Sequence, residues 1–111
     1  MQEQQGLGEL EQVVLLAILR LKDSAYGVSI RQEIEACTAR AVTPGALYTT
    51  LERLERKELV TARSGDPTPQ RGGRAKRFYL VTSAGRDRLK YAQVGFHSLL
   101  KGLNLLGENY G

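Results

Sequence analysis

The segment that most constrains the fold lies in the middle of the chain, where a short helical pattern precedes two strand-like runs and a loop. Thr43 and Pro44 predict a helix start, because a threonine cap accepts a hydrogen bond from the first amides and proline fits the first helical position. Residues 59–63 and 76–81 are rich in β-branched and aromatic side chains, which predicts two antiparallel strands. Residues 64–75 are rich in glycine and proline, which predicts a long projecting loop between the strands.

The charge of the chain is concentrated in this loop and its flanks. Residues 63–77 contain five basic residues and one acidic residue, and the rest of the chain is balanced, so they carry the whole formal net charge of +4. A localised excess indicates an anionic partner, and the alternative is a flexible loop made soluble by arginines. One compact helix followed by a long cationic hairpin is the layout of a winged helix-turn-helix, which predicts duplex DNA as the partner.

The helix that begins at Thr43 differs on its two sides. Leu47, Leu51 and Leu54 lie within about 60° of one another and are expected to face the core. The opposite side carries Gly45, Thr49, Glu52, Arg53 and Arg56. Small residues near the start and arginines further along suit a helix that enters a major groove by its N-terminal end. An ordinary amphipathic surface helix is the alternative, and the outward carboxylate of Glu52 counts against DNA binding because it repels phosphate.

Two more helices are expected earlier in the chain, over residues 7–21 and 26–38. The second has one apolar stripe that is expected to face inward. The stripe consists of Tyr26, Ile30, Ile34 and Cys37. The first helix is apolar on more than one side, so we expect it to pack both on its own domain and on something else.

A long final helix is predicted over Ser83–Leu106, with Thr82 as its cap. Its length of about 36 Å exceeds what a small domain can cover. Its apolar seam, with alternating steps of three and four, consists of Leu89, Ala92, Phe96, Leu99, Leu103 and Leu106. The seam is too short for an isolated coiled coil, so we expect a homodimer in which this helix also packs on the first helix of the partner. A helix folded back onto its own core is the alternative.

Few residues are available for catalysis or metal binding. His97 is the single histidine and Cys37 the single cysteine, so neither an internal disulfide nor a Cys/His metal cluster is expected. No glycine-rich phosphate loop opens a helix after a strand. The acidic residues Glu52, Glu55 and Glu58 alternate with basic neighbours and are interpreted as surface solvation. We therefore expect neither enzyme activity nor a cofactor.

The sequence also bears on location. Residues 1–6 are polar, and the apolar run over residues 13–19 is far shorter than the roughly 20 residues that span a bilayer. We expect no signal peptide, no contact with a membrane and a cytoplasmic location.

Four segments together resemble the PadR family of bacterial transcriptional regulators. They are LGELEQVVLLAIL at 7–19, AYGVSIRQEI at 25–34, GALYTTLERLERKELV at 45–60 and RGGRAKRFYLVTSAGR at 71–86. The resemblance implies a winged helix that binds an operator as a homodimer, and some members of the family sense planar apolar compounds between the subunits. We accordingly expect a DNA-binding domain over residues 7–82 and a dimerisation helix over residues 83–107.

The resemblance also implies roles for single residues. Tyr48 and Thr49 would lie at the DNA backbone, and the wing cations would hold phosphates or reach the minor groove. With the residues deduced above, the expected DNA contacts are Thr43, Gly45, Tyr48, Thr49, Arg53, Arg71, Arg74, Lys76 and Arg77. The segment from Gly45 to Thr49 would supply the base reading.

Two departures from the family pattern bear on these expectations. Glu58 stands where the family has glycine after the recognition helix. Glycine adopts a left-handed conformation at low cost, so this helix end is expected to be strained or to run differently. The chain has no tryptophan, so Phe96 is the best remaining aromatic residue for stacking on a planar ligand, with a purely structural role as the alternative.

The sequence thus predicts a mainly α fold with a small β-hairpin, and a homodimeric, sequence-specific transcriptional regulator. We expect it to act as a repressor that a small apolar ligand releases from DNA. The second hypothesis is a winged-helix protein-interaction module that uses its basic hairpin on an acidic partner protein.

Overall fold

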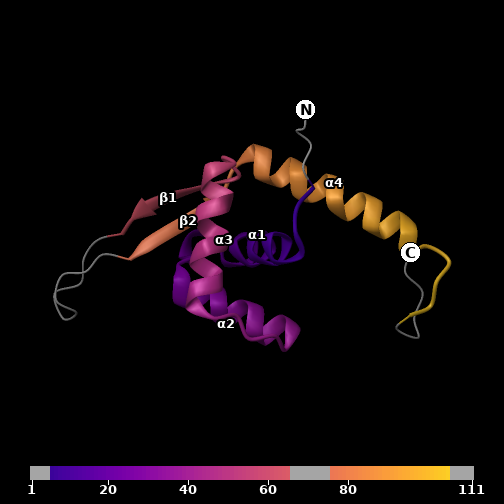
Figure 1. The fold of residues 1–111 in the computed structure, drawn as a ribbon, viewed down its shortest axis with the longest axis horizontal. Coiled ribbons are helices and arrows are strands. Elements are labelled where there is room, and N and C mark those ends of the chain that lie inside the picture. The colour runs from indigo at the N-terminus through magenta and orange to yellow at the C-terminus, as the bar shows by residue number, and fades with distance from the viewer. Residues whose placement is uncertain (1–5, 66–75, 106–111) are drawn as a thin grey trace.

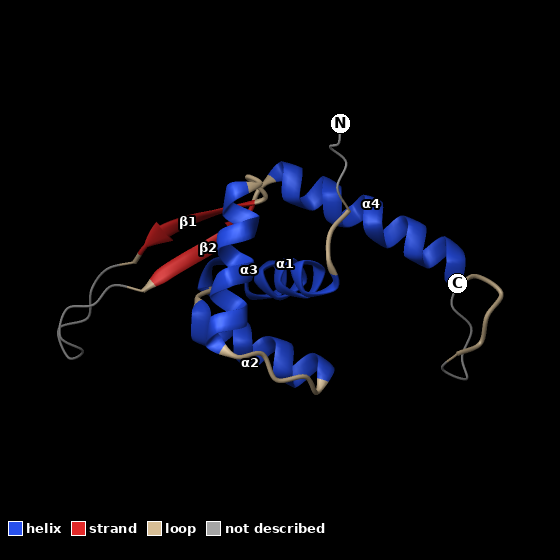
Figure 2. Ribbon diagram, in the orientation of Figure 1, coloured by secondary structure: helices blue, strands red, loops and turns tan. Residues whose placement is uncertain are grey.

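The computed structural model describes residues 6–65 and 76–105 of the chain. Its elements are the helices α1 (Glu9–Leu21), α2 (Gly27–Thr38) and α3 (Pro44–Arg56), the strands β1 (Val60–Ser64) and β2 (Arg77–Val81), and the helix α4 (Ser83–Leu100). The first three helices pack together, the two strands form a hairpin at one end of this body, and α4 extends toward the other end (Figure 1 and Figure 2). The expected fold class, a winged helix with one long C-terminal helix, is confirmed.

The first three helices share one apolar core. As expected, Leu47, Leu51 and Leu54 of α3 are almost fully buried, and they join a cluster with Ile18 of α1 and Ile30 of α2. Each such side chain contributes about 1.5–3 kcal/mol when it leaves water. The core therefore fixes which side of α3 points outward.

The start of α3 follows the sequence prediction. The Thr43 hydroxyl accepts a hydrogen bond from the Ala46 amide at 3.1 Å, and Pro44 occupies the first helical position. The turn before it is held by Arg31 of α2, whose Nε donates to the Val42 carbonyl at 2.9 Å. The Thr43 cap and the hydrogen bond from Arg31 together fix the position at which α3 begins.

The hairpin is attached to the helical body at its root. Its register runs from Val60 opposite Val81 to Ser64 opposite Arg77. The Tyr79 amide of β2 donates to the carbonyl of Ala25, just before α2, at 2.9 Å. The Tyr79 side chain is buried in the same core as the helices. The hairpin is thus an extension of the core, and its loop, residues 66–75, lies outside the described residues.

Helix α4 begins as predicted and ends earlier. The Thr82 hydroxyl accepts from the Gly85 amide at 3.0 Å, but the helix stops at Leu100 and not at Leu106. The chain leaves the helix at Lys101, whose ψ is 135°. Gly102 follows with a φ of +82°, a left-handed conformation that glycine adopts readily, and completes a turn in which the Leu103 amide donates to the Leu100 carbonyl at 3.0 Å. Leu103 therefore lies beyond the helix, and Leu106 lies outside the described residues.

Helix α2 corrects two expectations. Tyr26 is the residue before the helix, with an extended backbone, and it is only half-buried. Ile30 and Ile34 face the core as predicted, but Cys37 is exposed. The inward stripe ends one turn early, because an open cavity lies between α1 and the last turn of α2 and Cys37 lines it.

Candidate nucleic-acid interface

One side of α3 is open to solvent along its whole length. Thr43 at the cap, Gly45 in the first turn, and Tyr48, Thr49 and Arg53 further along are all exposed. A methyl group at Gly45 would meet nothing within 4 Å. The structure thus brings these five predicted DNA-contact residues together on one face, with the least side-chain bulk at its N-terminal end.

Tyr48 also joins α3 to the start of α2. Its side chain is 49% exposed, and its phenol lies directly against Gly27, the first residue of α2. A Cβ at Gly27 would clash with the Tyr48 hydroxyl and come within 2.9 Å of the ring atom Cζ. Only glycine leaves the tyrosine in this position, and the sequence analysis did not single it out, although its segment AYG was part of the family resemblance.

The loop end of the described hairpin carries cations stacked on aromatic rings. The Lys76 ammonium lies 4.3 Å from the centre of the Tyr26 ring, and the Arg63 guanidinium lies 5.0 Å from the Phe78 ring. The two rings are themselves 5.5 Å apart. These contacts hold two exposed cations beside the start of α2. Of the three predicted arginines of the wing, Arg71 and Arg74 lie outside the described residues.

The third, Arg77, has a carboxylate partner. Its Nη2 donates to Glu55 Oε2 at 3.0 Å, between β2 and the last turn of α3. A hydrogen bond with Tyr79 and the charge of Glu55 raise the pKa of Arg77 above its ordinary value. Glu55 is therefore part of a cross-element pair and not simply surface solvation, and it compensates part of the wing's positive charge.

Helix α4 presents an apolar surface away from the body. Its first half packs on α1, where Leu89 is buried and Gln93 Nε2 donates to Gln12 Oε1 at 3.0 Å. Further along, Phe96 is 63% exposed and Leu99 is 79% exposed. The predicted seam is thus buried at Leu89 and exposed at Phe96 and Leu99. The second half of α4 extends away from the other helices (Figure 1).

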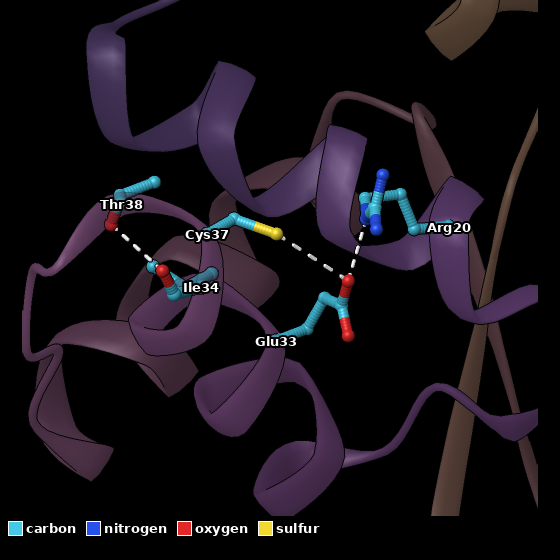
Figure 3. A network of polar contacts seen from close by, with 5 residues as sticks. All are labelled: Arg20, Glu33, Ile34, Cys37 and Thr38. Carbon is cyan, nitrogen blue, oxygen red and sulfur yellow. Dashed lines mark hydrogen bonds and ion pairs between the residues drawn. The ribbon is translucent and has the colours of Figure 1, made fainter.

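The cavity between α1 and α2 is a separate feature of about 340 Å³ with mostly apolar walls. At its edge Arg20 Nε donates to Glu33 Oε2 at 2.5 Å, and the Cys37 thiol donates to the same oxygen at 3.6 Å (Figure 3). The hydrogen bond from Arg20 lowers the pKa of Glu33. The carboxylate that faces Cys37 is therefore held in its charged form.

Residues 6–65 and 76–105 contain no group of three His, Cys, Asp or Glu side chains that could hold a metal ion. No helix in the same part of the chain is long and apolar enough to cross a membrane.

An exposed helix face beside a hairpin that carries cations at its loop end defines the chain as a winged-helix nucleic-acid-binding protein. The family model described as "Transcriptional regulator PadR-like family" matches residues 15–91. The chain therefore belongs to this family, and its function class is DNA-binding regulation of transcription. The family is one of regulators and not of enzymes.

Relatives and solved structures agree with this assignment. A protein of Lysinibacillus sphaericus described as "Uncharacterized protein X" is 38% identical over 84 residues, which cover 74% of this chain and 72% of the relative. The X-ray structure of a PadR-like transcription factor from Bacteroides fragilis matches with a TM-score of 0.67 and 26% identity, covering 81% of this chain and 82% of that one. A PadR family transcription regulator from Clostridium difficile R20291 shares the fold, with a TM-score of 0.66 and 23% identity over 88% of this chain and 98% of that one.

Proposed function

We propose that this chain is a homodimeric, sequence-specific DNA-binding protein that acts as a transcriptional repressor. The observation that carries the proposal is the open face of α3, which has little bulk at its N-terminal end and belongs to the same body as the cationic hairpin. A helix of this kind fits the major groove of B-DNA, which is about 12 Å wide.

The residues of α3 divide into two roles. Gly45 and Thr49 would face base edges, because they lie near the leading end of the helix and a small side chain lets the backbone approach closely. Thr43, Tyr48 and Arg53 would contact the phosphate backbone and fix the orientation of the helix on the duplex. Base reading would then come from few residues, and much of the affinity from phosphate contacts.

The hairpin would hold the neighbouring backbone. Lys76 lies at the loop end of the described hairpin and is placed by the Tyr26 ring. Arg71 and Arg74 are proposed from the sequence alone. Arg77 would reach DNA by leaving Glu55 or by sharing its donors with a phosphate, so its contribution to affinity is smaller than that of an unpaired arginine.

The second half of α4 would form the homodimer. Phe96 and Leu99 together expose an apolar surface that a second copy would cover, and α1 offers the exposed side chain of Leu16. Two α3 helices would then enter successive major grooves about 34–36 Å apart, which implies a near-palindromic site.

An apolar effector is the remaining part of the proposal. An open groove of about 450 Å³ lies between α1 and α4, and its walls include Leu16, Leu19 and Leu89. Phe96 lies about one turn beyond Gln93, which also lines this groove, and would stack on a planar ligand in the dimer. Thermal-shift screening with planar dyes tests this idea. A dye that raises the Tm of the wild-type protein should lose this effect in Phe96→Ala. If no compound of a broad panel raised the Tm, the hypothesis of an apolar effector would be refuted.

DNA binding is tested by a mobility-shift titration of duplex DNA at several salt concentrations. Lys76→Ala should weaken binding to all sequences and flatten the logarithmic salt dependence by about one unit. The matched control is Lys101→Ala, at the far end of α4, which should leave the slope unchanged. An unchanged slope in Lys76→Ala would remove the wing from the interface. No shift at low salt would favour the interaction module that binds an acidic protein.

Dimerisation is tested by sedimentation with two substitutions on the same helix. Phe96→Glu should give monomers at micromolar concentration, because it buries a carboxylate in the seam. Val94→Glu is the control, because Val94 is 58% exposed and lies about 160° around the helix from Phe96. The same oligomeric state in the two variants would show that this seam is not part of the dimer interface.

The repressor role needs a separate test. A duplex selected from a random pool by the wild-type protein is placed across a promoter, and transcription is measured with purified polymerase. Silencing by the wild-type protein and not by Phe96→Glu supports repression by the dimer, and unchanged transcription would remove the repressor role.

A further inference from the structure

Glu11 is a charged side chain that the DNA-binding face does not use, and it is only 5% exposed. It lies in the first turn of α1, next to the apolar core. A buried carboxylate is costly unless its oxygens are paired. The partners of Glu11 therefore show what this residue holds in place.

Both carboxylate oxygens of Glu11 have a donor. The Gly8 amide donates to Oε1 at 2.8 Å, and the Lys57 ammonium donates to Oε2 at 2.9 Å. Burial acts to raise the pKa of Glu11, but the hydrogen bonds from Lys57 and Gly8 and the charges of Lys57 and Arg53 outweigh it, so the pKa lies below its ordinary value. The Glu11 carboxylate is thus ionised at neutral pH.

Lys57 is the residue that follows the last turn of α3. The ion pair therefore joins the first turn of α1 to the C-terminal end of the helix that carries the DNA-contacting face. Gly45 lies twelve residues away from this anchor, or about 18 Å along the helix. A tilt of about 5° at the anchor would move Gly45 by about 1.5 Å, which is more than the ~0.5 Å tolerance of a well-placed binding group.

The neighbouring residue of α1 contacts the other functional helix. Gln12 accepts a hydrogen bond from Gln93 of α4, the helix proposed to form the dimer. The first turn of α1 thus touches both the end of α3 and the dimerisation helix. An anchor at this point sets the tilt of α3 relative to the dimer axis, and so the spacing of the two α3 helices on DNA.

We propose that Glu11 and Lys57 are positioning residues for DNA recognition: their partly buried ion pair fixes the tilt of α3. The inference rests on the proposed reading of DNA by α3. A purely structural pair would change stability, whereas a positioning pair changes the discrimination between specific and non-specific DNA in protein that remains folded.

Glu11→Gln separates positioning from simple electrostatics. It removes one negative charge, so electrostatics alone predicts tighter binding to every duplex. Positioning predicts weaker binding to the specific duplex, with binding to non-specific duplex unchanged or tighter. Lys57→Met breaks the same pair with the opposite change in charge, and Lys101→Met is its charge-matched control away from α3.

The experiment uses the full chain and two duplexes of equal length, one selected from a random pool by the wild-type protein and one scrambled. The ratio of the two affinities at fixed salt should fall about tenfold in Glu11→Gln and in Lys57→Met, and should be kept in Lys101→Met. The affinity ratio of the double variant should be no lower than that of either single variant, because all three variants lose the same ion pair. Lys57→Arg keeps an ion pair and should restore most of the ratio.

Amide hydrogen exchange provides a readout that does not depend on DNA. Exchange over residues 45–51 should rise at least tenfold in Lys57→Met, while exchange at Ile30 and Ile34 stays at the wild-type level. A wild-type protein that selects no preferred duplex would contradict sequence reading by α3 and leave this exchange test to decide on the anchor. Unchanged exchange, or an unchanged affinity ratio in folded Glu11→Gln, overturns the positioning role.

Discussion

Replacing Glu58 with glycine should stabilise the protein. Glu58 connects α3 to β1 and has a φ of +64°, in the left-handed region. Its amide donates to the Glu55 carbonyl at 2.9 Å, and its carbonyl accepts from the Thr82 hydroxyl at 2.9 Å. The backbone is thus held in this conformation from both sides, although a residue with a Cβ pays roughly 1–2 kcal/mol to adopt it.

The size of the effect follows from two opposing contributions. Glycine removes the steric cost but loses more backbone freedom on folding, which costs roughly 0.5–1 kcal/mol. The net gain in the free energy of unfolding should be about 1 kcal/mol, which corresponds to a rise in Tm of about 4 °C for a chain of this length. Urea unfolding followed by circular dichroism at one fixed protein concentration measures it, with an unchanged m-value as the sign that only stability has changed.

Glu58→Ala is the matched control for this prediction. It removes the same carboxylate but keeps the Cβ, so it should show little of the gain. If glycine and alanine at position 58 gave equal stabilities, the strain argument would be refuted, because the effect would then belong to the lost charge.

Three further outcomes are expected. Gly85→Ala should destabilise the protein by about 2 kcal/mol, because the added Cβ would clash with a main-chain carbonyl oxygen. Gly95→Ala, which has open space around the added Cβ, should stabilise the protein by about 0.5–1 kcal/mol. Urea unfolding of both variants measures the two changes. Gly27→Ala should displace Tyr48 and weaken DNA binding about tenfold while changing stability by less than about 1 kcal/mol, and unaltered binding would contradict the contact role of Tyr48. Because the pKa of Glu11 is lowered in the folded state, its contribution to stability is present above pH 4.5 and is lost as the pH falls through the lowered pKa. The free energy of unfolding, measured from pH 6 to pH 2, should therefore fall less steeply in Glu11→Gln than in the wild-type protein. Parallel curves for the two proteins would contradict the ion pair.

The sequence carried strong signals for the elements proposed to contact DNA. The cap at Thr43, the proline after it and three leucines at helical spacing determine where α3 begins and which side it buries, and each of these acts locally. The two strands were likewise predicted to within one residue at either end. The sequence was sufficient to predict the elements whose bounds and orientation depend on residues close together in the chain.

The features that the sequence analysis missed depend on residues far apart in the chain. Glu11 and Lys57 are 46 positions apart, and no periodicity links them. Cys37 fits the inward stripe by spacing, but its exposure depends on how far α1 covers the last turn of α2. The end of α4 was placed too late because the apolar spacing continues past Lys101 and Gly102, where the backbone turns out of the helix.

The hydrogen bond between the Tyr79 amide and the Ala25 carbonyl has a consequence for how such a scaffold can be re-engineered. Together with the buried Tyr79 ring, it secures the hairpin independently of whatever connects its two strands. Insertions or exchanges between positions 65 and 76 would leave both attachments intact. The strength of binding to the DNA backbone could therefore be tuned by grafting this connection alone, while the base reading proposed for α3 would be kept.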